Sequence, residues 1–294
     1  MGERAVFVLI FIGFIIVAIS VFGGFAMSGG HLGPLYQPME FLIIGGAALG
    51  SFIAANNGKA IRATVRTLSR LKRSTKYDRA VYMELMALQY KLLWKMRRDG
   101  AIGIEKDIEA PADSEIFNEH PRLLQDPMIM GFTTDYLRLM VSGSMDPMEV
   151  DELMTHEIEA FEHEARVPAD ALLKVGDALP AFGIVAAVLG VVKALASADA
   201  GAGEIGLMVA HALVGTFVGI LLAYGFVNPL ASRIERQVQE AVKVLQCIRV
   251  TLLANLNGYA PQLAVEFGRK TLDTSERPTF GELEEHVRPT LSAA

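Results

Sequence analysis

Cysteine is almost absent from this 294-residue chain, and the signatures of common enzymes are missing as well. Cys247 is the only cysteine, which excludes an intramolecular disulfide framework and a CxxC metal site. We interpret it as a buried, unreactive thiol. The sequence has no GxxxxGK[ST], GxSxG or HExxH motif, and His120, His156 and His163 lack the spacing of metal ligands. The sequence therefore gives no support to an enzyme, a bound metal or a cofactor.

Charged side chains are missing from the middle of four apolar runs. With 52% hydrophobic residues and a mean hydropathy of +0.35, the chain is too apolar for a soluble domain of its size. A run of about 20 residues can cross a hydrocarbon layer of about 30 Å as a helix. We expect four membrane spans. They are an N-terminal run that reaches about residue 27, and runs at about 39–55, 175–195 and 205–227.

The few ionisable residues of these runs lie away from their centres. Glu40 and Asp177 are at or near span ends, and Glu204 precedes the fourth span. His211 is about two turns into the fourth span; it is either a proton relay or, as we favour, an interfacial histidine satisfied by its neighbours. Lys193 is placed so that its amine can reach the interface. A protein that moves ions needs a group in the membrane that binds the ion, and no span centre supplies a carboxylate.

Basic residues are missing from the short connections after the first and third runs. They follow the second and fourth runs instead, so the positive-inside rule places both termini and the middle segment in the cytoplasm. A basic run could bind nucleic acid, but beside a membrane helix we favour lipid. These basic residues are Lys59, Arg62, Arg66, Arg70, Lys72, Arg73, Lys76, Arg79, Arg233 and Arg236.

The remaining sequence is typical of helices in water. Apolar residues recur at helical spacing after residue 78, up to a stop at Gly100. Asp146 is the expected N-cap of a second helix, followed by Pro147 and by Glu149 three residues on, and a C-terminal helix is expected to end at Gly258. We predict an all-α membrane protein with four transmembrane helices and a large helical cytoplasmic domain between the second and third. The predicted segments are 1–56 (spans one and two), 57–174 (cytoplasmic domain), 175–228 (spans three and four) and 229–294 (cytoplasmic helix and tail).

Small residues form rows on the third and fourth spans. Such rows mark helix contacts in membranes, because lipid offers no hydrophobic driving force for association. Two uses remain open at this point: contact within the chain or between its copies, and a surface for a third helix. The rows contain Pro180, Gly183, Ala187, Gly190 and Ala194 on the third span and Gly215, Gly219 and Ala223 on the fourth.

Six stretches in order along the chain carry a resemblance to a known family: "GGHLGPLYQPMEFLIIGGAALGSF", "NNGKAI", "GDALPAFGIVAAVLGVV", "AHALVGTFVGILLAYGFVNPLA", "LNGYAPQLAVEFGRKTL" and "SERPTF". In these stretches the chain resembles the MotA family of flagellar stator subunits, which is related to the TolQ and ExbB channels. It implies a multi-pass protein of the bacterial inner membrane in which several copies, a pentamer, surround a dimer of MotB. A MotB aspartate would bind the proton, and its helix would lie on the small faces of spans three and four.

The resemblance also implies roles for single residues. Ala187 and Thr216 would line the ion path, and we expect protons because sodium-driven relatives tend to place a hydroxyl where Ala187 stands. Pro180 and Pro229 would couple ion flow to movement. Arg97 and Glu105 would engage the rotor protein FliG, and Arg98 could share the role of Arg97. Two alternatives are a TolQ- or ExbB-like subunit that energises an outer-membrane system and a membrane scaffold without ion flow.

Overall fold

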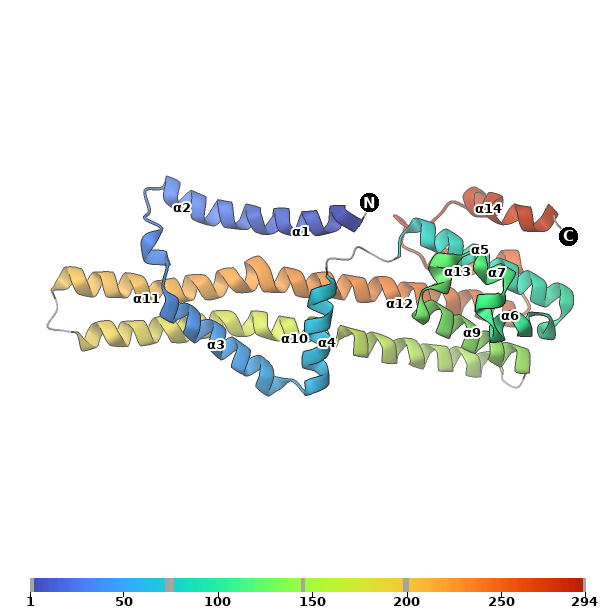
Figure 1. The fold of residues 1–294 in the computed structure, drawn as a ribbon, viewed down its shortest axis with the longest axis horizontal. Coiled ribbons are helices and arrows are strands. Elements are labelled where there is room, and N and C mark those ends of the chain that lie inside the picture. The colour runs from blue at the N-terminus through green and yellow to red at the C-terminus, as the bar shows by residue number, and fades with distance from the viewer. Residues whose placement is uncertain (1–2, 72–76, 144–145, 198–200, 293–294) are drawn as a thin grey trace. The chain divides into compact units, whose positions relative to one another are not determined.

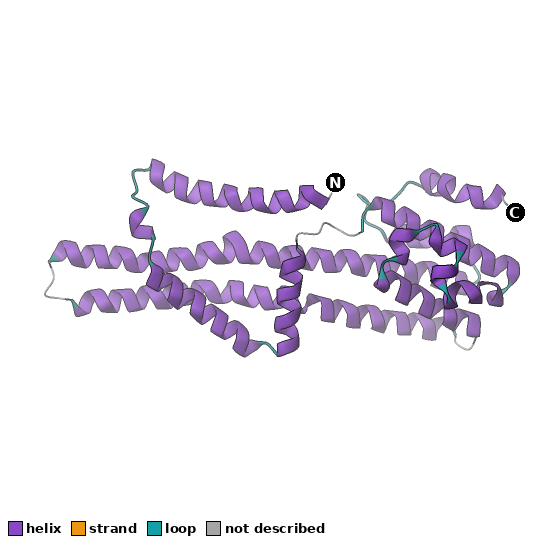
Figure 2. Ribbon diagram, in the orientation of Figure 1, coloured by secondary structure: helices purple, strands orange, loops and turns teal. Residues whose placement is uncertain are grey.

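The computed structural model of the chain describes residues 3–71, 77–143, 146–197 and 201–292. Over these ranges the chain forms helices joined by short loops and contains no strand (Figure 2). Helices that are long and apolar enough to cross a membrane are present in the described residues at all four predicted places. The predicted all-α class with four spans is therefore confirmed. The candidate spans lie within Val8–Met27, Gly33–Ala55, Pro147–Ala196 and Ala202–Leu256.

The chain divides into two compact units, and the long helices α10 (Pro147–Ala196) and α12 (Asn228–Leu256) each contribute to both. Unit 1 combines Met1–Ser74 with Ala165–Gln237, and unit 2 combines Thr75–Glu164 with Val238–Ala294. Each unit is thus assembled from segments far apart in the sequence.

Unit 1 contains the apolar helices. In Figure 1 the second part of α10 lies beside α11, and α3 crosses them obliquely. Their contact is apolar: Ile44 of α3 is fully buried in a cluster with Leu179 and Val218. The elements of unit 1, apart from α10 and α12, are α1 (Glu3–Ala18), η1 (Ile19–Gly23), α2 (Gly24–Met27), η2 (Gly33–Leu35), α3 (Pro38–Ala55), α4 (Gly58–Arg70), α11 (Ala202–Leu222) and η5 (Ala223–Val227).

Helix α4 is amphipathic and turns across α10 in Figure 1. Asn57 caps it by accepting a hydrogen bond from the backbone N–H of Ala60 (2.9 Å), as short polar side chains do at helix starts. Its apolar side includes Leu71 at the C-cap, which packs with Ala169 and Ala231 of α10 and α12. The opposite face is solvent-exposed and basic, and it carries Lys59, Arg62 and Arg66.

Unit 2 has its own core, centred on α5. Gly100 ends this helix with a φ of +80°, a conformation that favours glycine, so the predicted stop is confirmed. Ten residues of α5 are buried, among them Leu85, Leu88 and Leu93. The elements of unit 2, apart from α10 and α12, are α5 (Arg79–Asp99), η3 (Ala101–Ile104), α6 (Glu105–Glu109), η4 (Pro111–Asp113), α7 (Glu115–Asn118), α8 (Pro121–Leu124), α9 (Pro127–Ser142), α13 (Pro261–Thr271) and α14 (Phe280–Ser292).

The predicted start of α10 is confirmed at the level of hydrogen bonds. Asp146 Oδ1 accepts from the N–H of Met148 (2.8 Å), and Glu149 Oε2 accepts from the N–H of Asp146 (3.1 Å). This reciprocal arrangement satisfies backbone donors that a helix start leaves free.

The last predicted helix ends slightly earlier than expected: α12 stops at Leu256 rather than at Gly258, which adopts a φ of +88°. Cys247, on this helix, is fully buried, as predicted.

Candidate functional site

Two glycines bring the backbones of α10 and α11 into direct contact. A Cβ atom added at Gly219 would lie 2.5 Å from the carbonyl oxygen of Leu179, and one added at Gly183 would lie 2.8 Å from that of Gly215. Both distances are shorter than carbon–oxygen contacts allow, so only glycine fits at either position. The two helices approach here as closely as small residues permit.

The same contact continues one to two turns further along the helices. A Cβ at Gly190 would lie 2.5 Å from the Cβ of Ala212, and a Cβ at Gly215 would lie 3.0 Å from that of Ala186. The glycines of the two small-residue rows therefore face each other within one chain. Of the two uses left open by the sequence, contact within the chain holds for these glycines.

Ala187 and Thr216, which the resemblance places on the ion path, lie beside this glycine contact. Ala187 is 9% exposed, and Thr216 is half-buried. The Cα of Thr216 is 3.2 Å from the position of a Cβ at Gly183, one turn along α10 from Ala187. The two residues thus belong to neighbouring layers of one packed helix pair.

Pro229 lies just after a π-helical segment, η5, from which only Asn228 separates it. Proline has no N–H to donate to the carbonyl four residues earlier, and its ring collides with that carbonyl. The carbonyl belongs to Gly225, within η5. A local widening to π geometry relieves this conflict and is common where helices bend.

Pro180 lies inside α10 and removes the same kind of hydrogen bond from the carbonyl of Gly176. The side chain of Asn228 lies against Gly176: its Oδ1 is 1.8 Å from where a Cβ would stand. This oxygen is buried and has no hydrogen-bond partner among the described residues. The residue before Pro229 therefore contacts the residue one turn before Pro180.

Glu40 is a residue whose position the sequence did not reveal. It lies in the first turn of α3, at a span end as predicted, but its carboxyl group reaches the α10–α11 contact. Oε2 is 2.1 Å from the position of a Cβ at Gly215, and Oε1 is 3.7 Å from that of one at Gly190. The place of Glu40 at a span end could be predicted from the sequence, but no sequence pattern indicates that α3 crosses α10 and α11 obliquely.

A cavity of about 280 Å³ adjoins this carboxyl group. Its polar lining consists of Gln37, Glu40, Lys193 and His211. Two ionisable residues interpreted separately from the sequence, Lys193 and His211, thus line the same cavity as Glu40. The apolar part of the lining consists of Met39, Ile43, Ala186, Leu189, Gly190, Met208 and Ala212.

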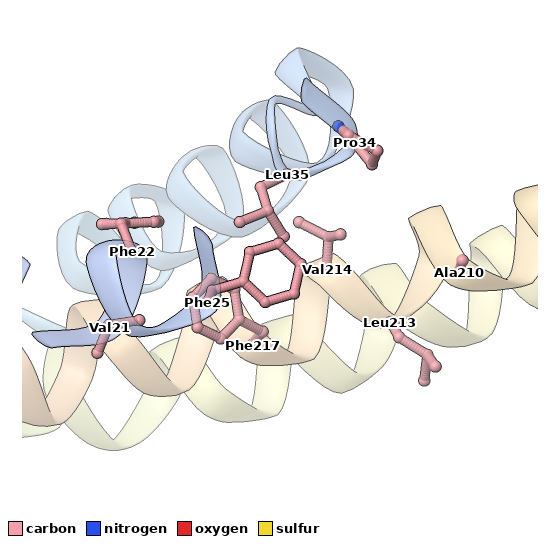
Figure 3. A pocket seen from close by; sticks show the side chains of 9 residues that line it. All are labelled: Val21, Phe22, Phe25, Pro34, Leu35, Ala210, Leu213, Val214 and Phe217. Carbon is pink, nitrogen blue, oxygen red and sulfur yellow. The ribbon is translucent and has the colours of Figure 1, made fainter. Parts of the chain in front are cut away.

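A second cavity in unit 1, of about 430 Å³, is lined entirely by apolar residues (Figure 3). Side chains from η1 and α2, from the α2–α3 connection and from α11 surround it. Because no lining residue has a polar side chain to replace the hydration shell of an ion, the cavity is not suited to an ion path. Its lining consists of Val21, Phe22, Phe25, Pro34, Leu35, Ala210, Leu213, Val214 and Phe217.

In unit 2, Arg97 and Glu105 lie on either side of the turn at Gly100. Arg97 is in the last turn of α5 and Glu105 begins α6, and both are exposed. Neither forms an ion pair with any residue within the described ranges. Between them lies Ile102, an apolar side chain that is 75% exposed.

Arg98 and Asp99, two other charged residues near this turn, are paired with each other. Arg98 donates two hydrogen bonds to Asp99 (2.6 and 2.8 Å) and lies 4.6 Å from the ring centre of Trp94. These bonds lower the pKa of Asp99 from its usual value. Arg98 therefore differs from Arg97, whose guanidinium remains available.

A buried carboxylate holds the turn in place. Asp107 Oδ2 accepts a hydrogen bond from Lys95 (2.7 Å), and its Oδ1 accepts one from Ser114 (2.7 Å). Ile104 is fully buried beneath the turn. The exposed charges thus project from a fixed support.

Sequence comparison assigns the chain to a family. Residues 11–100 match the family model described as "Motility protein A N-terminal", and residues 125–247 match the "MotA/TolQ/ExbB proton channel family". "Motility protein A" of Salmonella typhimurium is 58% identical over 280 residues, which cover 95% of each chain. The chain belongs to the motility protein A family. It is therefore a membrane protein of bacterial motility and of the proton channel family.

Two solved structures share the fold of this motility protein A family member. "Structure of C. jejuni MotAB" matches with a TM-score of 0.73 at 19% identity, covering 90% of this chain and 95% of that one. "Structure of the flagellar MotAB stator complex from Bacillus subtilis" matches with a TM-score of 0.68 at 23% identity, covering 87% and 92%. At these identities the likeness establishes the fold.

Proposed function

We propose that this chain is a flagellar stator subunit that forms a proton path with MotB and converts inward proton flow into torque on the rotor protein FliG. The observation that carries the proposal is the 58% identity to a motility protein A over 95% of both chains. The basic residues after the second and fourth spans support an orientation in the bacterial inner membrane with both termini in the cytoplasm.

The ion path would run along the α10–α11 pair, at Ala187 and Thr216. Because the glycines of this pair face each other within the chain, the MotB helix would pack on the side that Ala187 and Thr216 border. Its aspartate would take up and release the proton there. Several copies of the chain, a pentamer, would surround a MotB dimer. Successive protonations of the MotB aspartate would then occur beside different copies of the chain.

Pro180 and Pro229 would couple ion loading to movement. Each removes a backbone hydrogen bond, and bending concentrates where such a bond is missing. The π-helical segment before Pro229 and the contact of Asn228 with Gly176 support a bend shared by α10 and α12.

Rotor contact would use Arg97 and Glu105. Exposed charges steer a partner without holding it tightly, which suits repeated engagement and release. The support for this role is that both side chains are exposed and unpaired among the described residues, whereas Arg98 is held by Asp99.

Charge reversal tests the rotor contact. We expect Arg97→Glu, Glu105→Arg and the double variant to reduce swimming speed to below about half of wild type, since rim charges control encounter rather than folding. The amount of chain in the membrane should not change. Glu164→Lys, at an exposed position of unit 2, is the matched control and should swim normally. Wild-type swimming by the double variant, in cells with an intact rotor, would contradict the proposed contact.

Proton uptake tests the channel role. Vesicles containing this chain and MotB should take up protons, and replacing the intramembrane aspartate of MotB should stop the uptake. A scaffold without ion flow predicts no uptake in either case. Co-purification with a TolR- or ExbD-type protein in place of MotB would favour the TolQ- or ExbB-like alternative.

A further inference from the structure

The carboxyl group of Glu40 occupies a notch between α10 and α11. The two positions that it approaches, Gly190 and Gly215, lack side chains, and a Cβ at Gly215 would collide with Oε2. The notch lies next to the path residues, because Gly215 precedes Thr216 and the cavity-lining Ala186 precedes Ala187. A carboxyl group from a third helix thus reaches the level of the proposed ion path.

Nothing in the described part of the chain holds this carboxyl group fully in place. Its Oε2 is buried and accepts no hydrogen bond there. A partly buried acid with a buried, unpartnered oxygen is unfavourable as a permanent anion, and ionisable residues within membrane helices usually serve ion movement. A purely structural side chain at this position would be expected to use both oxygens.

The surroundings of Glu40 suit proton exchange rather than a fixed ion pair. The cavity of about 280 Å³ beside it has room for water, and its other ionisable lining residues are His211 from α11 and Lys193 from α10. Gln37, the N-cap residue of α3, also lines the cavity and adds a polar side chain. Histidine is the residue whose charge changes most readily near neutral pH.

We propose that Glu40 is a proton-loading site of this chain. The Glu40 carboxylate receives protons from the outer side and passes them to the path at Ala187 and Thr216, and His211 is its positioning residue. The inference rests on the proposed proton path and on its orientation. In the loading step, hydronium in the cavity gives its proton to the Glu40 carboxylate and becomes water. In the unloading step, the carboxyl group returns to carboxylate as water on the path side accepts the proton. His211 acts through Glu40, because its charge sets how readily the carboxylate binds a proton.

If Glu40 has this role, its replacement should reduce motor speed by an amount that depends on the load and on the external pH. When the motor turns slowly against a high load, each step leaves ample time for loading, so loading does not limit speed. At low load, and when external protons are scarce, loading becomes limiting. A merely structural role would reduce speed equally under all these conditions.

The experiment compares motors built from Glu40→Gln and His211→Gln with wild type, in cells that contain MotB and an intact rotor. Glu204→Gln is the matched control, because Glu204 is an exposed acid in the first turn of α11. Speed at low load is measured from about pH 6 to about pH 8, and torque is measured at high load. Loss of an acid–base group slows proton transfer strongly, so we expect Glu40→Gln to lose at least about threefold in low-load speed at the upper pH. We expect a smaller loss at the lower pH and near-normal torque at high load.

His211→Gln, which keeps the carboxyl group, should shift the pH at which low-load speed falls, and Glu40→Asp should recover part of the speed. Normal pH profiles for both glutamine variants would overturn the proposal, as would an equal loss at every load and pH. If Glu40→Gln is not found in the membrane, an unchanged profile for His211→Gln alone overturns it. Failure of the wild-type and Glu204→Gln motors to depend on proton flow would instead contradict the proposed function.

Discussion

The side-chain oxygen of Asn228 lies against the backbone of Gly176, at a point where even a methyl group could not fit. Gly176 is the residue whose carbonyl loses its helix partner at Pro180, and Asn228 immediately precedes Pro229. The points weakened by Pro180 and Pro229 are therefore in contact, although they are about 50 positions apart in the sequence. A bend at one proline cannot occur without moving the surroundings of the other.

Gly176→Ala tests this connection. The added methyl group would lie 1.8 Å from Asn228 Oδ1, so the two helices must separate or Asn228 must leave its position. Either movement breaks the contact between Asn228 and Gly176, and we expect swimming speed to fall to below about half of wild type with the chain still present in the membrane. Gly45→Ala is the matched control, because a Cβ at Gly45 meets no atom within 4 Å. Normal swimming by Gly176→Ala would show that the contact does not affect coupling.

The glycine contact between α10 and α11 should be a main source of stability in unit 1. Gly219→Ala places a methyl group 2.5 Å from the carbonyl oxygen of Leu179, and overpacking typically destabilises by about 1–3 kcal/mol. We expect a matching loss in the free energy of unfolding of the full chain in detergent. Gly206→Ala, on the same helix but with open space around it, should be neutral or slightly stabilising, since alanine is the better helix former. Equal stabilities for the two variants would contradict the close approach.

Local features of this fold could be predicted from the sequence because each is encoded within a few residues. The cap formed by Asp146 and Glu149, the stop at Gly100 and the burial of Cys247 are of this kind. The rows of small residues indicated a close helix contact, but they could not identify what the contact was with. A row of small residues has the same pattern whether it packs against a helix of the same chain or against a helix of another chain. Only the arrangement of α10 and α11 shows which contact the glycines make.

Glu40 is a second example of a feature that could not be predicted from the sequence. Its place at a span end could be predicted from the sequence, but its proposed function depends on the angle at which α3 crosses α10 and α11. That angle comes from the packing of Ile44 and its apolar neighbours, and such packing leaves no pattern that a single sequence displays. The difference between Arg97 and Arg98 could not be predicted either. Only the structure shows that Arg98 contacts Asp99 and Trp94, whereas Arg97 does not.

Ile102 should act as an apolar anchor in the rotor contact between Arg97 and Glu105. It is 75% exposed in the free chain, and burying such a side chain in an interface contributes about 1–2 kcal/mol. We expect Ile102→Ala to weaken rotor binding by that amount and to leave the stability of the chain within about 0.5 kcal/mol, as for other surface positions. Cross-linking yield to the rotor protein and swimming speed measure the effect. Met148→Ala, at a side chain that is 77% exposed elsewhere in unit 2, should change neither, and a normal cross-linking yield for Ile102→Ala would exclude the anchor.

His120 should make unit 2 less stable in acid. The side chain is 6% exposed, and its Nε2 has no hydrogen-bond partner within the described ranges. Burial, with a further contribution from the charge of Lys91, lowers the pKa of His120. Below the ordinary histidine value of about 6.5, the unfolded chain therefore binds a proton more readily than the folded chain, so the free energy of unfolding decreases as the pH falls. Hydrogen exchange of α8 and its neighbours in the full chain, corrected for the intrinsic exchange rate, should show protection that declines from about pH 7 to about pH 5.

His120→Asn removes the titrating ring and keeps a residue suited to a helix start, since His120 is the N-cap of α8. This variant should show a flatter dependence of protection on pH, whereas His163→Asn, at an exposed position of the same unit, should keep the wild-type slope. Because the lowered pKa acts only when the ring is buried, the effect should be confined to unit 2 peptides. A wild-type slope in His120→Asn would assign the acid sensitivity to other groups.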